Sequence, residues 1–123
     1  MSWTLDAGRP IYLQLQEELE LRIVTGQYPP GSQLPSVRLL AQEAAVNPNT
    51  MQKALQELER SGMVYTQRTS GRFVTEDREM IEKTKLRLAS AQATAFLEAM
   101  RKLGFTAEEA LDLVKQAETE EEV

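Results

Sequence analysis

Five polar side chains between residues 47 and 53 carry groups that can recognise DNA. Asn49 and Gln52 have amides that can pair two atoms with adenine, and Lys53 can reach guanine or a backbone phosphate. Asn47 and Thr50 add a further amide and a hydroxyl in the same short segment. The alternative interpretation is a solvated polar turn between two core helices, and the residue types alone leave both interpretations open.

Two short helical patterns joined by a tight turn would position these side chains. Apolar residues on one face predict a first helix over 36–44, opened by Ser36 as its N-cap, and a second over roughly 49–61. Residues 45–47 form the turn, and Pro48 fits the first positions of a helix. This is a helix-turn-helix pattern, in which the second helix enters a major groove and its N-terminus faces phosphate.

The apolar spacing then changes from helical to alternating. Residues 63–67 and 72–75 predict two strands joined by a turn. The turn region contains basic, small and polar residues, namely Arg68, Ser70, Gly71 and Arg72. A hairpin directly after a recognition helix is a wing, and its arginines suit contact with a DNA groove or backbone. The alternative is a sheet that only caps the helices, and the two arginines argue against it.

Several short motifs, spaced along residues 9–75, follow one another in a characteristic order. They are Pro10-Ile11-Tyr12-Leu13-Gln14, Gly26, Pro30-Gly31, Leu34-Pro35-Ser36-Val37-Arg38, Leu40-Ala41, Val46-Asn47-Pro48-Asn49-Thr50, Lys53-Ala54, Leu58-Glu59, Gly62 and Gly71 with Phe73-Val74. Together they resemble the GntR family of winged helix-turn-helix transcriptional regulators. The chain length and the short helical tail resemble its YtrA-type subfamily.

The chain departs from the family pattern at a few positions. Leu39 stands where the family often has a polar residue, and Leu55 where it often has an aromatic one. Pro48 replaces a basic residue of many relatives, which removes one direct contact. The wing tip has Ser70-Gly71 in place of Gly-x-Gly. These differences bear on base preference and wing geometry more than on the fold.

The resemblance implies a sequence-specific DNA-binding transcriptional regulator, a repressor, that binds a palindromic operator as a homodimer. From the residue chemistry and the resemblance together, the expected DNA-binding residues are Ser36, Arg38, Asn47, Pro48, Asn49, Thr50, Gln52, Lys53, Arg68, Ser70, Gly71 and Arg72. Arg38 matches the arginine of the family's Leu-Pro-Ser-x-Arg motif, and the alternative is a solvated surface arginine. A small-molecule inducer of unknown identity would bind at the dimer interface or between the tail and the winged domain.

Residues 77–123 predict two helices, separated at Gly104, with a capping box at Thr106 and Glu109 opening the second. The apolar positions expected to form a dimer contact are Leu86, Ala89, Ala93, Phe96, Met100, Leu103, Leu111 and Val114. Two helices this short cannot bury both apolar stripes by themselves. We therefore expect a second copy of the chain to cover these apolar stripes. The alternative is that the tail folds back onto its own winged domain.

The expected fold class is mainly α with a small β-hairpin: a winged helix-turn-helix domain plus a C-terminal helical hairpin. The expected parts are a loose N-terminal arm over 1–9, the DNA-binding domain over 10–76 and a helical dimerisation tail over 77–123. A helix over 11–25 should direct Tyr12, Leu15, Leu19 and Ile23 to the core and Gln14, Glu17, Glu18 and Arg22 outward. A short strand at Gln33-Leu34 is expected to join the wing sheet. The sequence does not decide whether Trp3 packs on the body or on a partner.

The composition argues against an enzyme and against metal or cofactor binding. The chain contains no histidine and no cysteine, which removes the usual general base, the commonest metal ligand and thiolate sites. No segment resembles a signal peptide or a membrane span, so we expect a cytoplasmic protein without membrane contact.

The net charge of −5 is unusual for a DNA-binding protein, but the charge is unevenly distributed. Residues 28–75 contain five basic and three acidic side chains, whereas the segments on either side are acidic. The basic excess is small, so useful affinity should depend on dimerisation. The competing function is a winged-helix protein–protein interaction adaptor without DNA readout, and the polar helix N-terminus and Arg38 argue against it.

Overall fold

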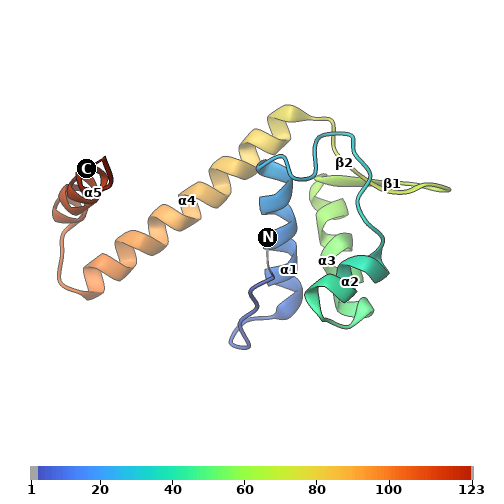
Figure 1. The fold of residues 1–123 in the computed structure, drawn as a ribbon, viewed down its shortest axis with the longest axis horizontal. Helices are drawn as coiled ribbons and strands as arrows, with labels where there is room; N and C mark the ends of the chain where they lie inside the picture. The colour runs from blue at the N-terminus through green and yellow to red at the C-terminus, as the bar shows by residue number, and fades with distance from the viewer. Residues whose placement is uncertain (1–2, 123) are drawn as a thin grey trace. The chain divides into compact units, whose positions relative to one another are not determined.

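The computed structural model describes residues 3–122, so the first two residues of the expected arm lie outside the described part of the chain. The chain divides into two compact units, Met1–Lys85 and Leu86–Val123. The elements are α1 (Ile11–Val24), α2 (Val37–Ala44), α3 (Pro48–Ser61), β1 (Val64–Gln67), β2 (Gly71–Val74), α4 (Arg78–Lys102) and α5 (Ala107–Glu122) (Figure 1). The expected fold class, a winged helix-turn-helix followed by C-terminal helices, is confirmed.

The helix-turn-helix forms because polar side chains cap both of its helices. The Ser36 hydroxyl accepts a hydrogen bond from the Leu39 amide at 3.1 Å and opens α2. The Asn47 side chain accepts from the Asn49 amide at 2.8 Å, so α3 begins at Pro48, one residue earlier than expected. Between the helices, Ala45 adopts a left-handed φ of 56°, which turns the chain sharply.

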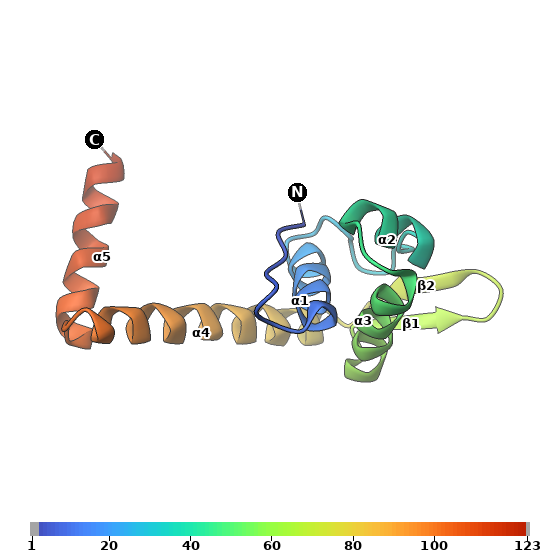
Figure 2. The same ribbon diagram turned by 90° about the horizontal axis from the view of Figure 1, so that it is seen from below.

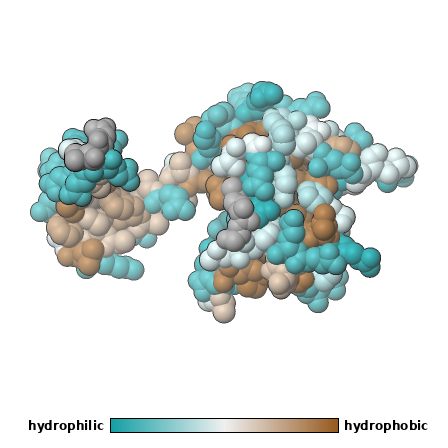
Figure 3. All heavy atoms as spheres, in the orientation of Figure 1, coloured by the Kyte–Doolittle hydropathy of each residue, from teal (hydrophilic) through white to brown (hydrophobic). Residues whose placement is uncertain are grey.

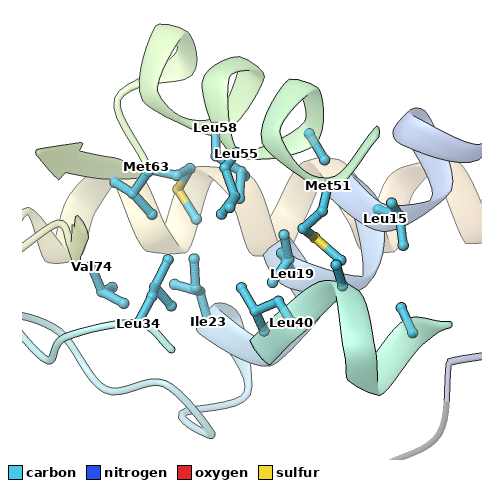
Figure 4. Close-up of a cluster of buried hydrophobic side chains, with 14 residues drawn as sticks. Leu15, Leu19, Ile23, Leu34, Leu40, Met51, Leu55, Leu58, Met63 and Val74 are labelled. Atoms are coloured by element: carbon cyan, nitrogen blue, oxygen red, sulfur yellow. The ribbon is translucent and has the colours of Figure 1, made fainter. Parts of the chain in front are cut away.

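The core of the first unit joins α1, α2, α3 and the base of the wing (Figure 4). Its largest fully buried side chains are Leu15, Leu19, Ile23, Leu40, Met51, Leu55, Leu58, Met63 and Val74. Each contributes about 1.5–3 kcal/mol through burial of its apolar surface. The core therefore fixes the inward face of α3 and leaves its polar face outside.

Three of the orientations expected for α1 are wrong. Gln14 and Arg22 are buried, with 7% and 3% of their surface exposed, and Tyr12 is only half-buried. Gln14 is buried because it holds the arm: its amide donates to the carbonyls of Asp6 at 2.5 Å and Arg9 at 3.0 Å, and its oxygen accepts from the Asp6 amide at 2.7 Å. The described part of the arm is thus attached to α1.

Arg22 is buried beneath the arm and the loop after α1. Its guanidinium lies 4.1 Å from the centroid of the Trp3 ring and donates to the Tyr28 hydroxyl at 3.1 Å. Trp3 therefore packs on the body of its own chain, which answers the question that the sequence left open. The Glu43 carboxylate of α2 lies 3.8 Å from the same guanidinium.

The wing is an antiparallel pair in which Val64 faces Val74 and Gln67 faces Gly71. The loop after α1 lies along β2, where the Val74 amide donates to the Ser32 carbonyl at 2.8 Å and the Leu34 amide to the Arg72 carbonyl at 2.9 Å. A β-bridge joins Gln33 and Phe73, which confirms the expected short strand at this position. The wing therefore has a third segment along one edge.

The first turns of α4 belong to the first unit. Asp77 caps the helix by accepting from the amides of Glu79 at 3.1 Å and Met80 at 3.2 Å. Met80 packs against the core, and the buried Thr84 hydroxyl donates to the Met63 sulfur at 3.3 Å. The start of α4 is thus fixed to the base of the wing.

In the second unit, the remainder of α4 is followed by a tight turn and α5. The capping box is confirmed: the Glu109 amide donates to the Thr106 hydroxyl at 3.1 Å, and the Thr106 amide donates to the Glu109 carboxylate at 2.9 Å. After this turn α5 leads away from α4 and does not lie back along it, so the two C-terminal helices do not form the expected hairpin (Figure 2). Most apolar side chains of these helices consequently remain exposed.

Candidate nucleic-acid interface

The N-terminal half of α3 presents the predicted base-reading side chains on its outer face. Pro48, Asn49 and Lys53 are exposed, and Thr50 and Gln52 are half-buried. The fully buried Met51, Ala54, Leu55 and Leu58 face the core and fix the rotation of the helix. Asn47 is also exposed, but its side-chain oxygen already serves as the helix cap.

Lys53 lies over an aromatic ring that the sequence analysis assigned to the core. Its ammonium group is 3.9 Å from the centroid of the Tyr12 ring on α1. A cation at this distance from a ring face is attracted by the ring's negative face. Tyr12 therefore holds the cation at the exposed edge between α1 and α3. Sequence spacing alone could not reveal this contact, because the two residues belong to different helices.

The first turn of α2 contributes Ser36 and Arg38. Both are exposed, and the Ser36 hydroxyl accepts from the Leu39 amide. Within residues 3–122, no hydrogen bond or ion pair occupies the Arg38 side chain, so its guanidinium faces solvent. Leu39 beside it is 48% exposed, an apolar side chain on the same turn.

The wing brings its predicted residues close to this turn. A shallow hollow of about 370 Å³ is lined by residues 33–37, 66 and 70–72, so the α2 N-terminus and the wing face a common space. The Gln33 side-chain amide donates to the Ser70 carbonyl and ties the loop to the wing tip. Arg68 is exposed in the turn of the wing.

Arg72 differs from the other arginines of this surface. Its Nε donates to the Glu59 carboxylate of α3 at 2.6 Å, and only 18% of its side chain is exposed. Burial works against ionisation of Glu59, but hydrogen bonds from Arg72 and Thr66 and the charge of Arg72 outweigh it, so the Glu59 pKa is lowered. The pair is therefore charged at neutral pH.

The predicted dimer positions lie on the outside of α4 and α5. Leu86, Leu103 and Leu111 expose more than half of their surface, at 64%, 72% and 56%. Phe96 and Val114 expose 39% and 44%. Ala89 and Ala93 are exposed and Met100 is half-buried. Hydrophobic side chains gather on the surface of these helices in Figure 3.

Comparison with known proteins decides the family. Residues 11–74 match the family model described as bacterial regulatory proteins, gntR family. YhcF of Bacillus subtilis (strain 168), an uncharacterized HTH-type transcriptional regulator, is 39% identical over 109 residues, which cover 89% of this chain and 90% of that protein. The chain belongs to the GntR family. YtrA of the same organism, an HTH-type transcriptional repressor, is 35% identical and covers 79% of this chain and 70% of its own length.

Solved structures agree with this assignment. A GntR family transcriptional regulator from Listeria monocytogenes has a TM-score of 0.83 and 39% identity, over 91% of this chain and 98% of that one. AraR(DBD) in complex with operator ORX1 has a TM-score of 0.53 and 29% identity, over 61% of this chain and 92% of that one.

Membership of this GntR family makes the chain a DNA-binding transcription regulator and not an enzyme. Within residues 3–122, no three metal-ligating carboxylates gather at one point. No helix in the same range is both long and apolar enough to cross a membrane.

Proposed function

We propose that this GntR regulator is a repressor that reads a palindromic operator as a homodimer. The observation that carries the proposal is the exposed face of α3, where Asn49, Gln52 and Lys53 stand on a helix fixed by its buried face. Amide side chains at the N-terminal end of a recognition helix can pair with base edges in a major groove. The similarity to a repressor and to an operator-bound DNA-binding domain supports this function.

The electrostatic contacts in this proposal come from a small number of exposed cations. Arg38 on α2, Lys53 on α3 and Arg68 on the wing would meet phosphate or a groove edge. Three cations in an acidic chain provide little phosphate binding for one subunit. Two subunits on adjacent half-sites would double this contribution, which favours a dimeric complex.

The second copy would cover the exposed apolar side chains of the C-terminal helices. Surface hydrophobic residues that gather on one part of a protein mark interaction sites. On α4, Phe96 lies one turn before Met100. Leu103 follows directly after the end of α4, and Leu111 and Val114 lie on α5. Action on the bacterial chromosome implies a cytoplasmic location. An inducer of unknown identity would bind at the interface between the two copies.

The direct test is a gel-shift assay with the DNA upstream of the protein's own gene, against random DNA of equal length. Preferential binding to the upstream DNA supports an operator-reading regulator. Equal or absent binding to both would contradict it and favour the adaptor function.

Arg38→Ala is expected to weaken operator binding and to flatten its salt dependence. Loss of one phosphate contact should reduce the slope of log affinity against log salt concentration by about one. The measurement is operator affinity by fluorescence anisotropy at several salt concentrations. Arg60→Ala is the matched control, because Arg60 is 78% exposed near the end of α3 and pairs with Glu57. If affinity and slope are unchanged in Arg38→Ala, Arg38 is a solvated surface arginine without a DNA contact.

A further inference from the structure

Arg72 and Glu59 connect strand β2 of the wing to the recognition helix. Their side chains meet at 2.6 Å, with 18% and 33% of each exposed. A charge-assisted hydrogen bond of this length is stronger than one between neutral groups. The residues belong to β2 and α3, so the contact restrains one element relative to the other.

Thr66 of β1 also helps to lower the pKa of the Glu59 carboxylate. Thr66 and Arg72 face each other across the two strands. The Glu59 carboxylate of α3 therefore meets the wing at this level of the ladder, through Arg72 of β2. A two-stranded hairpin is marginally stable alone in water, so its direction depends on such contacts.

The tip of the wing is also held by the loop after α1. The Gln33 side-chain amide donates to the Ser70 carbonyl, and a Cβ at Gly71 would lie only 3.0 Å from that amide nitrogen. Gly71 also has a φ of 110°, which other residues rarely adopt. Tyr65 and Phe73 stack across the strands with centroids 5.8 Å apart.

We propose that Arg72 is a positioning residue: together with Glu59 it fixes the direction of the wing relative to α3, and so determines where Arg68 meets DNA. This inference rests on the DNA-binding function proposed above. Fixing the wing before binding lowers the entropic cost of ordering it on the operator. Arg72 also keeps the Glu59 carboxylate from facing the phosphates as an unpaired negative charge.

The competing role for Arg72 is a phosphate contact that Glu59 weakens by competition. The two roles predict opposite effects for Glu59→Gln. If the pair positions the wing, loss of the carboxylate weakens operator binding. If Glu59 only competes with DNA, loss of the carboxylate releases Arg72 and strengthens binding.

The experiment measures operator affinity for Glu59→Gln, Arg72→Gln and the double variant at several salt concentrations. We expect each single variant to lose about three- to tenfold in affinity, on the scale of one partly exposed ion pair, with the salt slope unchanged. The double variant should bind no more weakly than Arg72→Gln, because both changes remove the same contact. Tighter binding by Glu59→Gln, or a slope reduced by about one in Arg72→Gln, would overturn the proposal.

Matched controls separate the contact from the change in charge. Glu57→Gln and Arg60→Gln remove the same kinds of charge at an ion pair whose two members both lie on α3. They should leave affinity within about twofold of the wild type, as is usual for an exposed pair. If the two control variants lose as much operator affinity as the Glu59 and Arg72 variants, the effect is due to net charge and the proposal is overturned.

Hydrogen exchange without DNA provides a readout that does not depend on operator binding. Amides of residues 65–73 should exchange faster in Glu59→Gln and Arg72→Gln, while α1 amides stay protected and report an intact fold. The exchanged pair Glu59→Arg with Arg72→Glu should restore slow exchange. Unchanged wing exchange in both single variants would overturn the positioning role even if the wild type binds DNA. Faster exchange with no operator binding by the wild type would retain the positioning role and contradict the proposed function.

Discussion

Phe96→Asp is expected to give a folded monomer that has lost most of its operator affinity. Phe96 lies in α4 with 39% of its surface exposed, on the same stripe as Ala89, Ala93 and Met100. If a second copy covers this stripe, the aspartate places an unpaired charge in an apolar contact. Separating two linked half-site contacts reduces avidity by about 10²-fold or more.

Sedimentation at micromolar concentration would measure the oligomeric state, and anisotropy on a palindromic operator would measure affinity. Thr94→Asp is the matched control, because Thr94 is exposed on the opposite side of the same helix and receives the same charge. It should remain dimeric and bind normally. A monomeric wild type that still binds the palindrome tightly would contradict the dimer proposal.

The same variant also distinguishes the dimer from the alternative in which the tail folds back onto its own winged domain. If the tail covered its stripe by folding back onto its own winged domain, Phe96→Asp would lower the unfolding midpoint without changing the oligomeric state. Thermal unfolding followed by circular dichroism at two protein concentrations distinguishes the cases. Only a dimer has a midpoint that depends on concentration.

Features set by neighbouring residues could be predicted from the sequence. Ser36 opens α2, and the reciprocal bonds of Thr106 and Glu109 open α5, because caps bind amides two or three residues away. The wing strands followed from alternation of apolar residues over a few positions. Each of these patterns depends only on residues close together in the sequence, so the packing of distant segments does not change the structure that it predicts.

Contacts between distant segments could not be predicted in this way. Gln14 and Arg22 were placed outside because they are polar, yet the Gln14 amide hydrogen-bonds to the backbone of the arm and the Arg22 guanidinium lies against the Trp3 ring of the arm. Arg72 was grouped with the DNA contacts because it is basic and near the wing tip. Its pairing with Glu59 depends on how the wing leaves α3, and that direction is set by core packing across the whole unit.

The same distinction applies to the recognition helix. Its buried positions were evident from helical spacing, and the exposed positions followed as their complement. The direction of the Lys53 side chain could not be predicted from helical spacing, because Tyr12 on another helix attracts its ammonium group. We therefore expect the amide side chains to report on base recognition more directly than the lysine does.

Gln52→Ala is expected to cost about 1–3 kcal/mol on the specific operator and to relax preference at one base position. A bidentate amide–adenine pair is lost completely when the side chain is truncated, whereas phosphate contacts elsewhere are retained. Asn49→Ala should act similarly at a neighbouring position, and α3 should remain capped, because the Asn49 backbone amide still donates to Asn47. The measurement is affinity for the operator and for each single-base variant of it.

The control is Gln56→Ala, which removes the same side chain from an exposed position one turn further along α3. Base edges are contacted mainly by the N-terminal residues of a recognition helix, so this variant should keep the base preference of the wild type. Random DNA supplies the second comparison, because a residue that reads bases should lose little affinity there when truncated. Equal losses for Gln52→Ala on operator and random DNA would exclude base readout by Gln52 and leave it a backbone contact.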